Sequence, residues 1–154
     1  MELAKGQYLV KLEADQVLCT EGEKNADLFI IHEGKLLICI RDKKSSQVTP
    51  LAYLEKGEYL GELSFFDREA RSADVIAVEP TTLVRIPEEE LGRQFPQWLV
   101  TLASTLTKRL RLMDEVVRDH GLKRKNVTSM APLDMAVQGK FFKILKDYDS
   151  THNP

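Results

Sequence analysis

The sequence is poor in the residue types that most often build catalytic and metal centres. It has three histidines, His32, His120 and His152, which lie far apart, and two cysteines, Cys19 and Cys39. Metal-dependent enzymes on β-barrels cluster their ligands, and hydrolases pair a nucleophile with a base, but neither spacing occurs here. Each cysteine lies in an apolar run without a Cys or His neighbour, so we expect reduced, buried thiols. We therefore do not expect an enzyme.

Long hydrophobic runs and an excess of one charge are also lacking. No apolar segment approaches the ~20 residues that a membrane-spanning helix needs, and the N-terminus lacks the apolar core of a signal peptide. A formal net charge of −2 gives no global reason to expect nucleic-acid binding. The 154 residues, 43% hydrophobic and 30% charged, are typical of one globular domain. We expect a cytoplasmic protein without a membrane partner.

Short apolar runs separated by turn residues fill the first half of the chain. Regular short strands joined by such turns predict a β-sandwich or jelly roll. The segments expected as strands are residues 8–12, 17–19, 28–31, 36–40, 48–54, 75–78 and 83–86.

Helical patterns replace the strand patterns after Pro87. This proline stands at a plausible first helical position before three glutamates, which predicts a short helix ending near Gly92. Pro96 then opens a long helix, expected over 95–125, with apolar residues at three- and four-residue steps. Charged residues, Arg111 among them, occupy its opposite face.

The chain is expected to end in a shorter amphipathic helix. Apolar residues at helical spacing predict it over 131–148, although Gly139 weakens it as a single helix. The tail at 149–154 is expected to fray.

The segment 57–66, with Arg71 shortly after it, carries the chemistry of a binding site. Gly61 lacks a Cβ where the backbone must approach another group. The helical turn expected after it offers free N–H groups to an anion, and Arg71 offers a guanidinium that suits a phosphate. Glu62 would repel a phosphate but can accept hydrogen bonds from hydroxyls such as those of ribose. From these residues alone, a turn glycine with unrelated surface charges is an equally good interpretation.

The same motif resembles the phosphate-binding cassette of cyclic nucleotide-binding domains, the sensor domains of the catabolite activator protein, cyclic-nucleotide-dependent kinases and gated channels. The resemblance extends over roughly residues 9–120, and it implies a mainly β fold with C-terminal α structure. A β-roll at 1–94, with the cassette at 57–73, would precede the long helix and the short terminal helix. The likeness rests on Gly61-Glu62-Leu63-Ser64 and Arg71-Ser72-Ala73, flanked by Glu21-Gly22-Glu23, Leu28 to Gly34 and Leu54 to Glu58.

The resemblance implies a cyclic nucleotide as regulatory ligand, with no other cofactor. Gly61 and the amides of Leu63 and Ser64 would receive the cyclic phosphate, and Glu62 would take the ribose 2′-hydroxyl. Arg71 would hold the phosphate charge. Further implied ligand-binding residues are Ser72 and Ala73 in the cassette, Ile38, Leu51 and Leu54 around base and sugar, and Arg109, Met113 and Asp114 on the long helix.

Several of these assignments leave alternatives open. The three apolar positions, Ile38, Leu51 and Leu54, fit plain core packing equally well. Arg109 is placed where it could pair with Glu62. Asp114 can accept from the amino group of adenine or from two N–H groups of guanine, and it also fits a solvated helix position. We expect cAMP, with cGMP as the alternative.

The function implied is a non-catalytic sensor whose C-terminal helices move when ligand binds. Only about six residues precede the first expected strand, so the helices that often transmit the signal in this family must be replaced by those at the C-terminus. Activator-type members dimerise through the long helix, so a homodimer and a protein effector are expected. About 30 residues follow that helix, too few for a winged helix-turn-helix, so DNA binding by this chain alone is not expected. The alternatives are the ligand-sensing part of a larger transcription regulator and a degenerate domain acting only in assembly.

Overall fold

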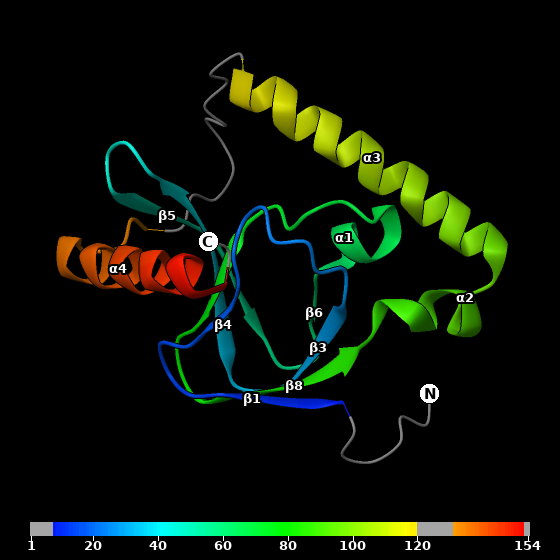
Figure 1. Cartoon of the computed structure of the whole chain (residues 1–154), viewed down its shortest axis with the longest axis horizontal. Helices are drawn as coiled ribbons and strands as arrows, with labels where there is room; N and C mark the ends of the chain where they lie inside the picture. Colours follow the sequence, from blue (N-terminus) through cyan, green and yellow to red (C-terminus); the bar gives the residue numbers. More distant parts are fainter. Residues whose placement is uncertain (1–7, 120–130, 153–154) are drawn as a thin grey trace.

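The computed structural model of this protein describes residues 8–119 and 131–152. Strands occupy the first part of the chain and helices the second (Figure 1). In chain order the elements are β1 (Leu9–Leu12), β2 (Val17–Cys19), β3 (Leu28–Glu33), β4 (Lys35–Asp42), β5 (Gln47–Glu55), β6 (Tyr59–Leu60), α1 (Glu62–Asp67), β7 (Asp74–Ala77), β8 (Thr81–Ile86), a 3₁₀ turn (Glu88–Glu90), α2 (Leu91–Gln94), α3 (Gln97–Asp119) and α4 (Met135–His152).

The strands form two antiparallel sheets that share one core. One sheet has the order β1-β8-β3-β6 and the other β2-β7-β4-β5. The expected β jelly roll followed by helices is therefore confirmed. Side chains from both sheets meet in the core cluster of Cys19, Phe29, Ile31, Leu36, Leu60, Val75, Ala77 and Leu83.

Strand β4 buries side chains on both of its faces, because α4 covers the outer face of its sheet. Leu36 belongs to the core between the sheets. Its neighbour Leu37 and Cys39 instead pack in a second cluster with Phe141 and Leu145 of α4. Because α4 covers the outer face, β4 carries a continuous apolar run. A strand with one solvated face would instead alternate apolar and polar residues. Figure 1 shows α4 lying beside β4 and β5.

Helix α4 is longer than the sequence predicts. It runs from Met135 to His152, passes through Gly139 without a break and includes four of the residues expected to fray. The tail prediction is wrong for 149–152 because Asp149 is held by an ion pair with Arg41, at 2.9 Å. Burial of one apolar face offsets the low helix propensity of the glycine. Residues 153–154 lie outside the described part of the chain.

The segment between the β-roll and the long helix also differs from the prediction. A 3₁₀ turn over Glu88–Glu90 leads directly into α2, so Gly92 lies inside a helix and does not end one. Helix α3 begins at Gln97 and is described to Asp119, while its expected end at 125 falls outside the described residues. In Figure 1, α3 passes over α1.

Candidate functional site

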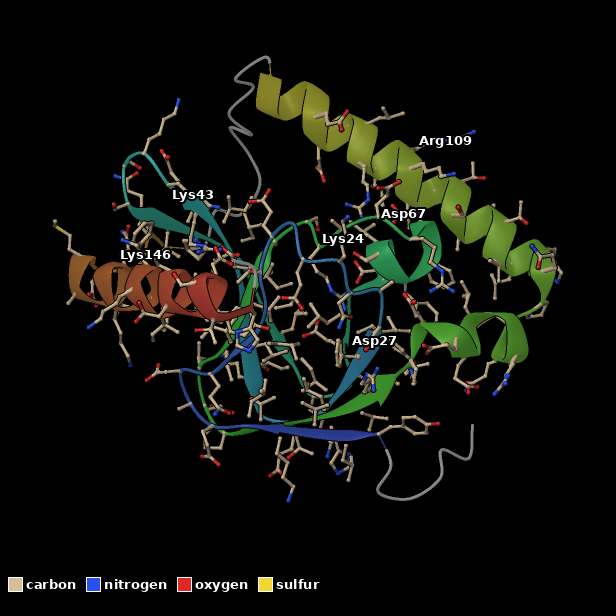
Figure 2. The ribbon with its side chains drawn as sticks, in the orientation of Figure 1. Lys24, Asp27, Lys43, Asp67, Arg109 and Lys146 are labelled. Carbon is tan, nitrogen blue, oxygen red and sulfur yellow. The ribbon has the colours of Figure 1, made fainter. Side chains whose placement is uncertain are left out.

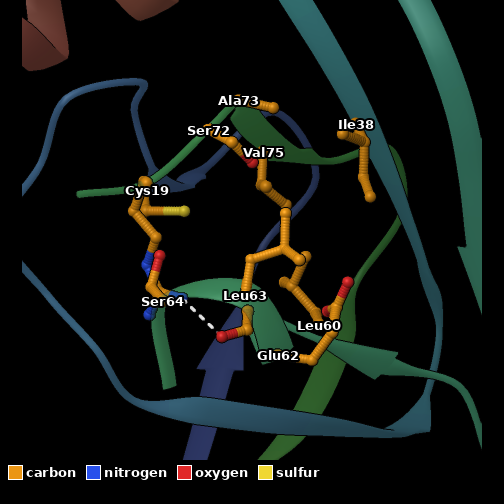
Figure 3. Close-up of a pocket in the computed structure, with 11 residues that line it drawn as sticks. Cys19, Ile38, Leu60, Glu62, Leu63, Ser64, Ser72, Ala73 and Val75 are labelled. Carbon is orange, nitrogen blue, oxygen red and sulfur yellow. Dashed lines mark hydrogen bonds between the residues drawn. The ribbon is translucent and has the colours of Figure 1, made fainter. Parts of the chain in front are cut away.

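A pocket opens beside the first turn of α1, within the β-roll (Figure 3). Its walls come from α1, from the segment between α1 and β7, and from β2, β4, β6 and β7. The structure therefore brings together the cassette residues and Ile38, and adds three apolar residues that sequence reasoning did not assign to the site. The lining residues are Cys19, Ile38, Leu60, Gly61, Glu62, Leu63, Ser64, Arg71, Ser72, Ala73 and Val75.

Gly61 lies at the N-terminal end of α1, at a position that has no room for a side chain. Its φ of 86° lies in the left-handed region, which is costly for residues with a Cβ. A Cβ built there would collide with the Arg71 guanidinium and lie 2.8 Å from the carbonyl oxygen of Asp27. This glycine therefore lets the backbone of the cassette close onto Arg71.

Arg71 is buried beneath the pocket, with 5% of its surface exposed. Its Nη2 donates to Asn25 Oδ1 at 2.7 Å and to the carbonyl oxygen of Asp27 at 2.8 Å, while Nη1 reaches the carbonyl oxygen of Gly61 at 3.5 Å. The guanidinium lies 5.7 Å from the ring centre of Phe29. All three acceptors are neutral oxygens, so the cation is held in place without being neutralised by them.

One donor of this guanidinium is left over. Arg71 Nε is buried and has no hydrogen-bond partner among the described residues. An unpaired buried donor costs free energy, about 1–3 kcal/mol, and is uncommon in native structures. Because Arg71 lines the pocket, an anion in the pocket is the natural group to satisfy it.

The first turn of α1 supplies further donors. Within the helix, the Phe65 amide donates to the Gly61 carbonyl at 3.0 Å, so the amides of Glu62, Leu63 and Ser64 precede the helical ladder. The Ser64 hydroxyl donates to the carbonyl oxygen of Ala70 at 3.2 Å and joins the turn to the segment that carries Arg71. Glu62 is exposed at the edge of the pocket.

Sequence reasoning missed a buried ion pair that ties α1 to α3. Arg111 Nε donates to Asp67 Oδ2 at 2.5 Å, and Nη2 donates to Oδ1 at 3.1 Å. The Asp67 side chain is fully buried, and that of Arg111 is 21% exposed. We expected Arg111 on a charged outer face, but it faces the cassette helix. No local pattern signals this pair, because its members are 44 positions apart.

Five of the expected site residues do not line the pocket. Leu51 is 47% exposed on β5, and Leu54 packs against the core between the sheets. Met113 and Asp114 lie exposed on α3. Arg109 is also exposed, on the side of α3 opposite Asp67 (Figure 2), and among the ion pairs of the described residues none joins it to Glu62. The base-binding assignments therefore stay predictions.

The two cysteines are buried and free, as expected. Burial raises the pKa of Cys19 to about 12, although the nearby Arg71 charge acts in the opposite direction. Burial likewise raises the pKa of Cys39 to about 12. Cys19 lines the pocket as a small apolar side chain.

In the described ranges, 8–119 and 131–152, no three His, Cys, Asp or Glu side chains come together as a metal site. No helix in those ranges combines the length and apolar character that crossing a membrane requires.

The chain is similar in sequence and fold to several known proteins. The cyclic AMP receptor protein of Thermus thermophilus is 35% identical over 97 residues, which cover 61% of this chain and 44% of that protein. A cGMP-dependent protein kinase of Eimeria tenella is 38% identical over 78 residues, 51% of this chain and 7% of the kinase. Among solved structures, the EAL enzyme Bd1971 in its cAMP-bound form matches with a TM-score of 0.59 at 30% identity, over 74% of this chain and 32% of that chain.

The chain spans less than half the length of each of these proteins. The model of one family, described as the cyclic nucleotide-binding domain, matches residues 9–97, which contain both sheets, the cassette and the pocket. Since this match covers more than half of the sequence, the chain belongs to the cyclic nucleotide-binding domain family.

Proposed function

We propose that this domain is a non-catalytic sensor of a cyclic mononucleotide, with cAMP as the preferred ligand. The observation that carries the proposal is the buried Arg71, whose Nε lacks a partner among the described residues while the side chain lines the pocket. The cyclic phosphate would take this donor together with the amides of Leu63 and Ser64. Glu62 at the pocket edge would accept from the ribose 2′-hydroxyl, and the Ser72 hydroxyl would add a bond to the phosphate.

The base would be recognised from the side of α3. Ile38 lines the pocket, but none of the α3 residues whose side chains are described does, so Met113 and Asp114 would reach the base only after α3 moves towards the β-roll. Asp114 would then accept from the amino group of adenine or, in the alternative, from two N–H groups of guanine. The relatives named for each nucleotide, and the solved neighbour Bd1971 with a cAMP-bound and a cGMP-bound form, support both options.

Two contacts would carry the ligand signal to α3. The Asp67–Arg111 pair joins the cassette helix to the middle of α3. On the other side, the carbonyl oxygen of Asp27 accepts from Arg71, while its carboxylate binds Arg85 and the amide of Glu88 ahead of α2. A phosphate that binds Arg71 and α1 would therefore affect both the Asp67–Arg111 pair and the contacts of Asp27 ahead of α2. A ligand shifts such an equilibrium only by its differential affinity for the two states.

A second copy of the chain is the proposed partner of α3. Trp98, Leu102, Leu106, Leu110 and Met113 are each about half exposed or more, and they recur at three- and four-residue steps along the helix. A stripe of this kind suits a helix–helix homodimer. Sedimentation velocity should give a dimer for the wild-type chain and a monomer for Leu106→Glu. Thr105→Glu, beside the stripe, is the matched control and should leave the dimer intact.

The binding proposal is tested by thermal unfolding with cAMP, cGMP and 5′-AMP at equal concentration. A ligand at a hundred times its dissociation constant adds about 2.7 kcal/mol to the free energy of unfolding, which raises the melting temperature by several degrees. The two cyclic nucleotides should give this shift and the linear one should not. No shift with any of them would favour a domain that acts only in assembly, and equal shifts with all three would contradict recognition of the cyclic phosphate.

A further inference from the structure

Helix α4 reaches the loop that holds Arg71, although it lies on the outer face of the sheet. We propose that Tyr148 and Asp149, at the C-terminal end of α4, are positioning residues for ligand binding. They fix the loop of residues 20–27, and this loop orients the guanidinium of Arg71. The inference rests on the proposed function and adds to it a C-terminal helix on which ligand affinity depends.

The loop of residues 20–27 is bonded to Arg71 through both backbone and side chains. The Gly22 amide donates to the Arg71 carbonyl at 2.9 Å, and the Arg71 amide donates to the Glu23 carbonyl at 3.0 Å. Further along the loop, Asn25 and Asp27 accept from Arg71 Nη2 at 2.7 and 2.8 Å. The direction of the guanidinium therefore depends on the shape of this loop.

The last turns of α4 bind the same loop from the opposite side. The Tyr148 hydroxyl donates to Glu23 Oε2 at 3.4 Å. That carboxylate oxygen also accepts from the Thr20 amide, at 3.2 Å. Asp149 forms a hydrogen bond with the Thr20 side chain. Two consecutive residues of α4 thus hold the loop at Thr20 and Glu23, next to the point where it pairs with Arg71.

A buried charge network strengthens this attachment. Arg41 donates to both oxygens of Asp74, at 2.7 and 2.9 Å, and its Nη1 lies 2.9 Å from Asp149. Asp74 is fully buried, follows the cassette by one residue, and accepts from the Glu21 amide at 2.9 Å. The network therefore joins α4 to both chain segments that border Arg71. Breaking one partner out of a buried ion network is strongly unfavourable, so this end of α4 is held tightly.

The other end of α4 provides an internal comparison. Lys140 pairs with Asp15, at 2.5 Å, where the two side chains are 54% and 37% exposed, outside the loop of residues 20–27. If α4 only stabilised the fold, loss of either attachment would act through stability alone. If the C-terminal end of α4 orients Arg71, only loss of the attachment at Tyr148 and Asp149 should lower the affinity for the phosphate of the ligand.

The test compares Tyr148→Phe/Asp149→Asn, which keeps the apolar packing, with the control Lys140→Met. In calorimetric titrations with cAMP, the double variant should bind about tenfold more weakly, within the range of typical coupling between sites, and the control should match wild type. In an Arg71→Lys background the double variant should cause little further loss, because both changes act on one group. An undiminished loss in that background, or equal affinities of double variant and wild type, would overturn the inference.

Hydrogen exchange of the ligand-free proteins keeps the inference separate from the proposed function. The amides of Gly22 and Arg71, which bond across the two segments, should exchange faster in the double variant than in wild type or Lys140→Met. Unchanged exchange there would overturn the positioning role even if cAMP binds. A wild-type protein that binds no cyclic nucleotide would remove the proposed function, while the exchange measurement would still decide whether α4 holds the loop.

Discussion

Replacing Arg71 with methionine is expected to separate ligand binding from folding stability. In the free protein the guanidinium is buried, and its hydrogen-bond acceptors in the described part of the chain are neutral oxygens. Methionine keeps much of the apolar volume beside Phe29 and removes a buried charge, whose desolvation costs several kcal/mol. Against this, the oxygens of Asn25 and Asp27 lose a donor, at about 1–3 kcal/mol. We expect these effects to offset, so that the free energy of unfolding changes by less than about 2 kcal/mol.

The same change should greatly weaken the ligand. A charge-assisted hydrogen bond to phosphate contributes about 1.5–3 kcal/mol. Its loss should raise the dissociation constant roughly tenfold to hundredfold. Urea unfolding measures the free energy of unfolding, and calorimetry with cAMP measures the dissociation constant. Arg68→Met is the control, because Arg68 forms an exposed pair with Glu88 and does not line the pocket. Full cAMP affinity in Arg71→Met would show that Arg71 does not bind the phosphate, and an unfolded variant would show that the guanidinium is needed for folding.

Three further outcomes follow from the geometry. Gly61→Ala should lower cAMP affinity at least about tenfold and cost more than about 2 kcal/mol of stability, because alanine is strained at this φ and its Cβ would collide with Arg71 and crowd the Asp27 carbonyl; near-native affinity by calorimetry would contradict this. Arg111→Met should lower the urea-derived free energy of unfolding by about 3 kcal/mol, because it leaves the Asp67 carboxylate buried and unpaired; a loss below about 1 kcal/mol would exclude a stabilising pair. Burial raises the pKa of Cys19 and Cys39 from 9.0 to about 12, so the unfolded chain loses these protons first and stability should fall as pH rises above about 9. Native protein at pH 8 should resist iodoacetamide until urea unfolds it.

The sequence predicted that the cassette residues and Ile38 lie together, and they do line one pocket. The groups proposed to bind phosphate lie close in sequence, between Gly61 and Ser72, so the glycine, the helical turn and the arginine can be recognised as one motif. Strands with regular turns likewise carry their own periodicity, and the jelly roll follows from it. These features depend on local chain geometry, which can be predicted from the composition and spacing of nearby residues.

What could not be predicted depends on contacts between distant parts of the chain. Arg111 has the spacing of a solvated helix position, and only the placement of α3 over α1 turns it towards Asp67. Asn25 looks like a turn residue, yet it is a main acceptor for Arg71. The end of α4 looks like a tail until the sheet presents Arg41 to Asp149. In each case the partner lies tens of residues away in the sequence, so the periodicity of a single helix or strand cannot predict the contact.

A crystal structure of the protein with cAMP would show directly how the nucleotide is held. We expect the cyclic phosphate within about 3 Å of Arg71 Nε and of the Leu63 and Ser64 amides, with the ribose 2′-hydroxyl on Glu62. A nucleotide bound elsewhere, or an empty pocket at saturating cAMP, would contradict it.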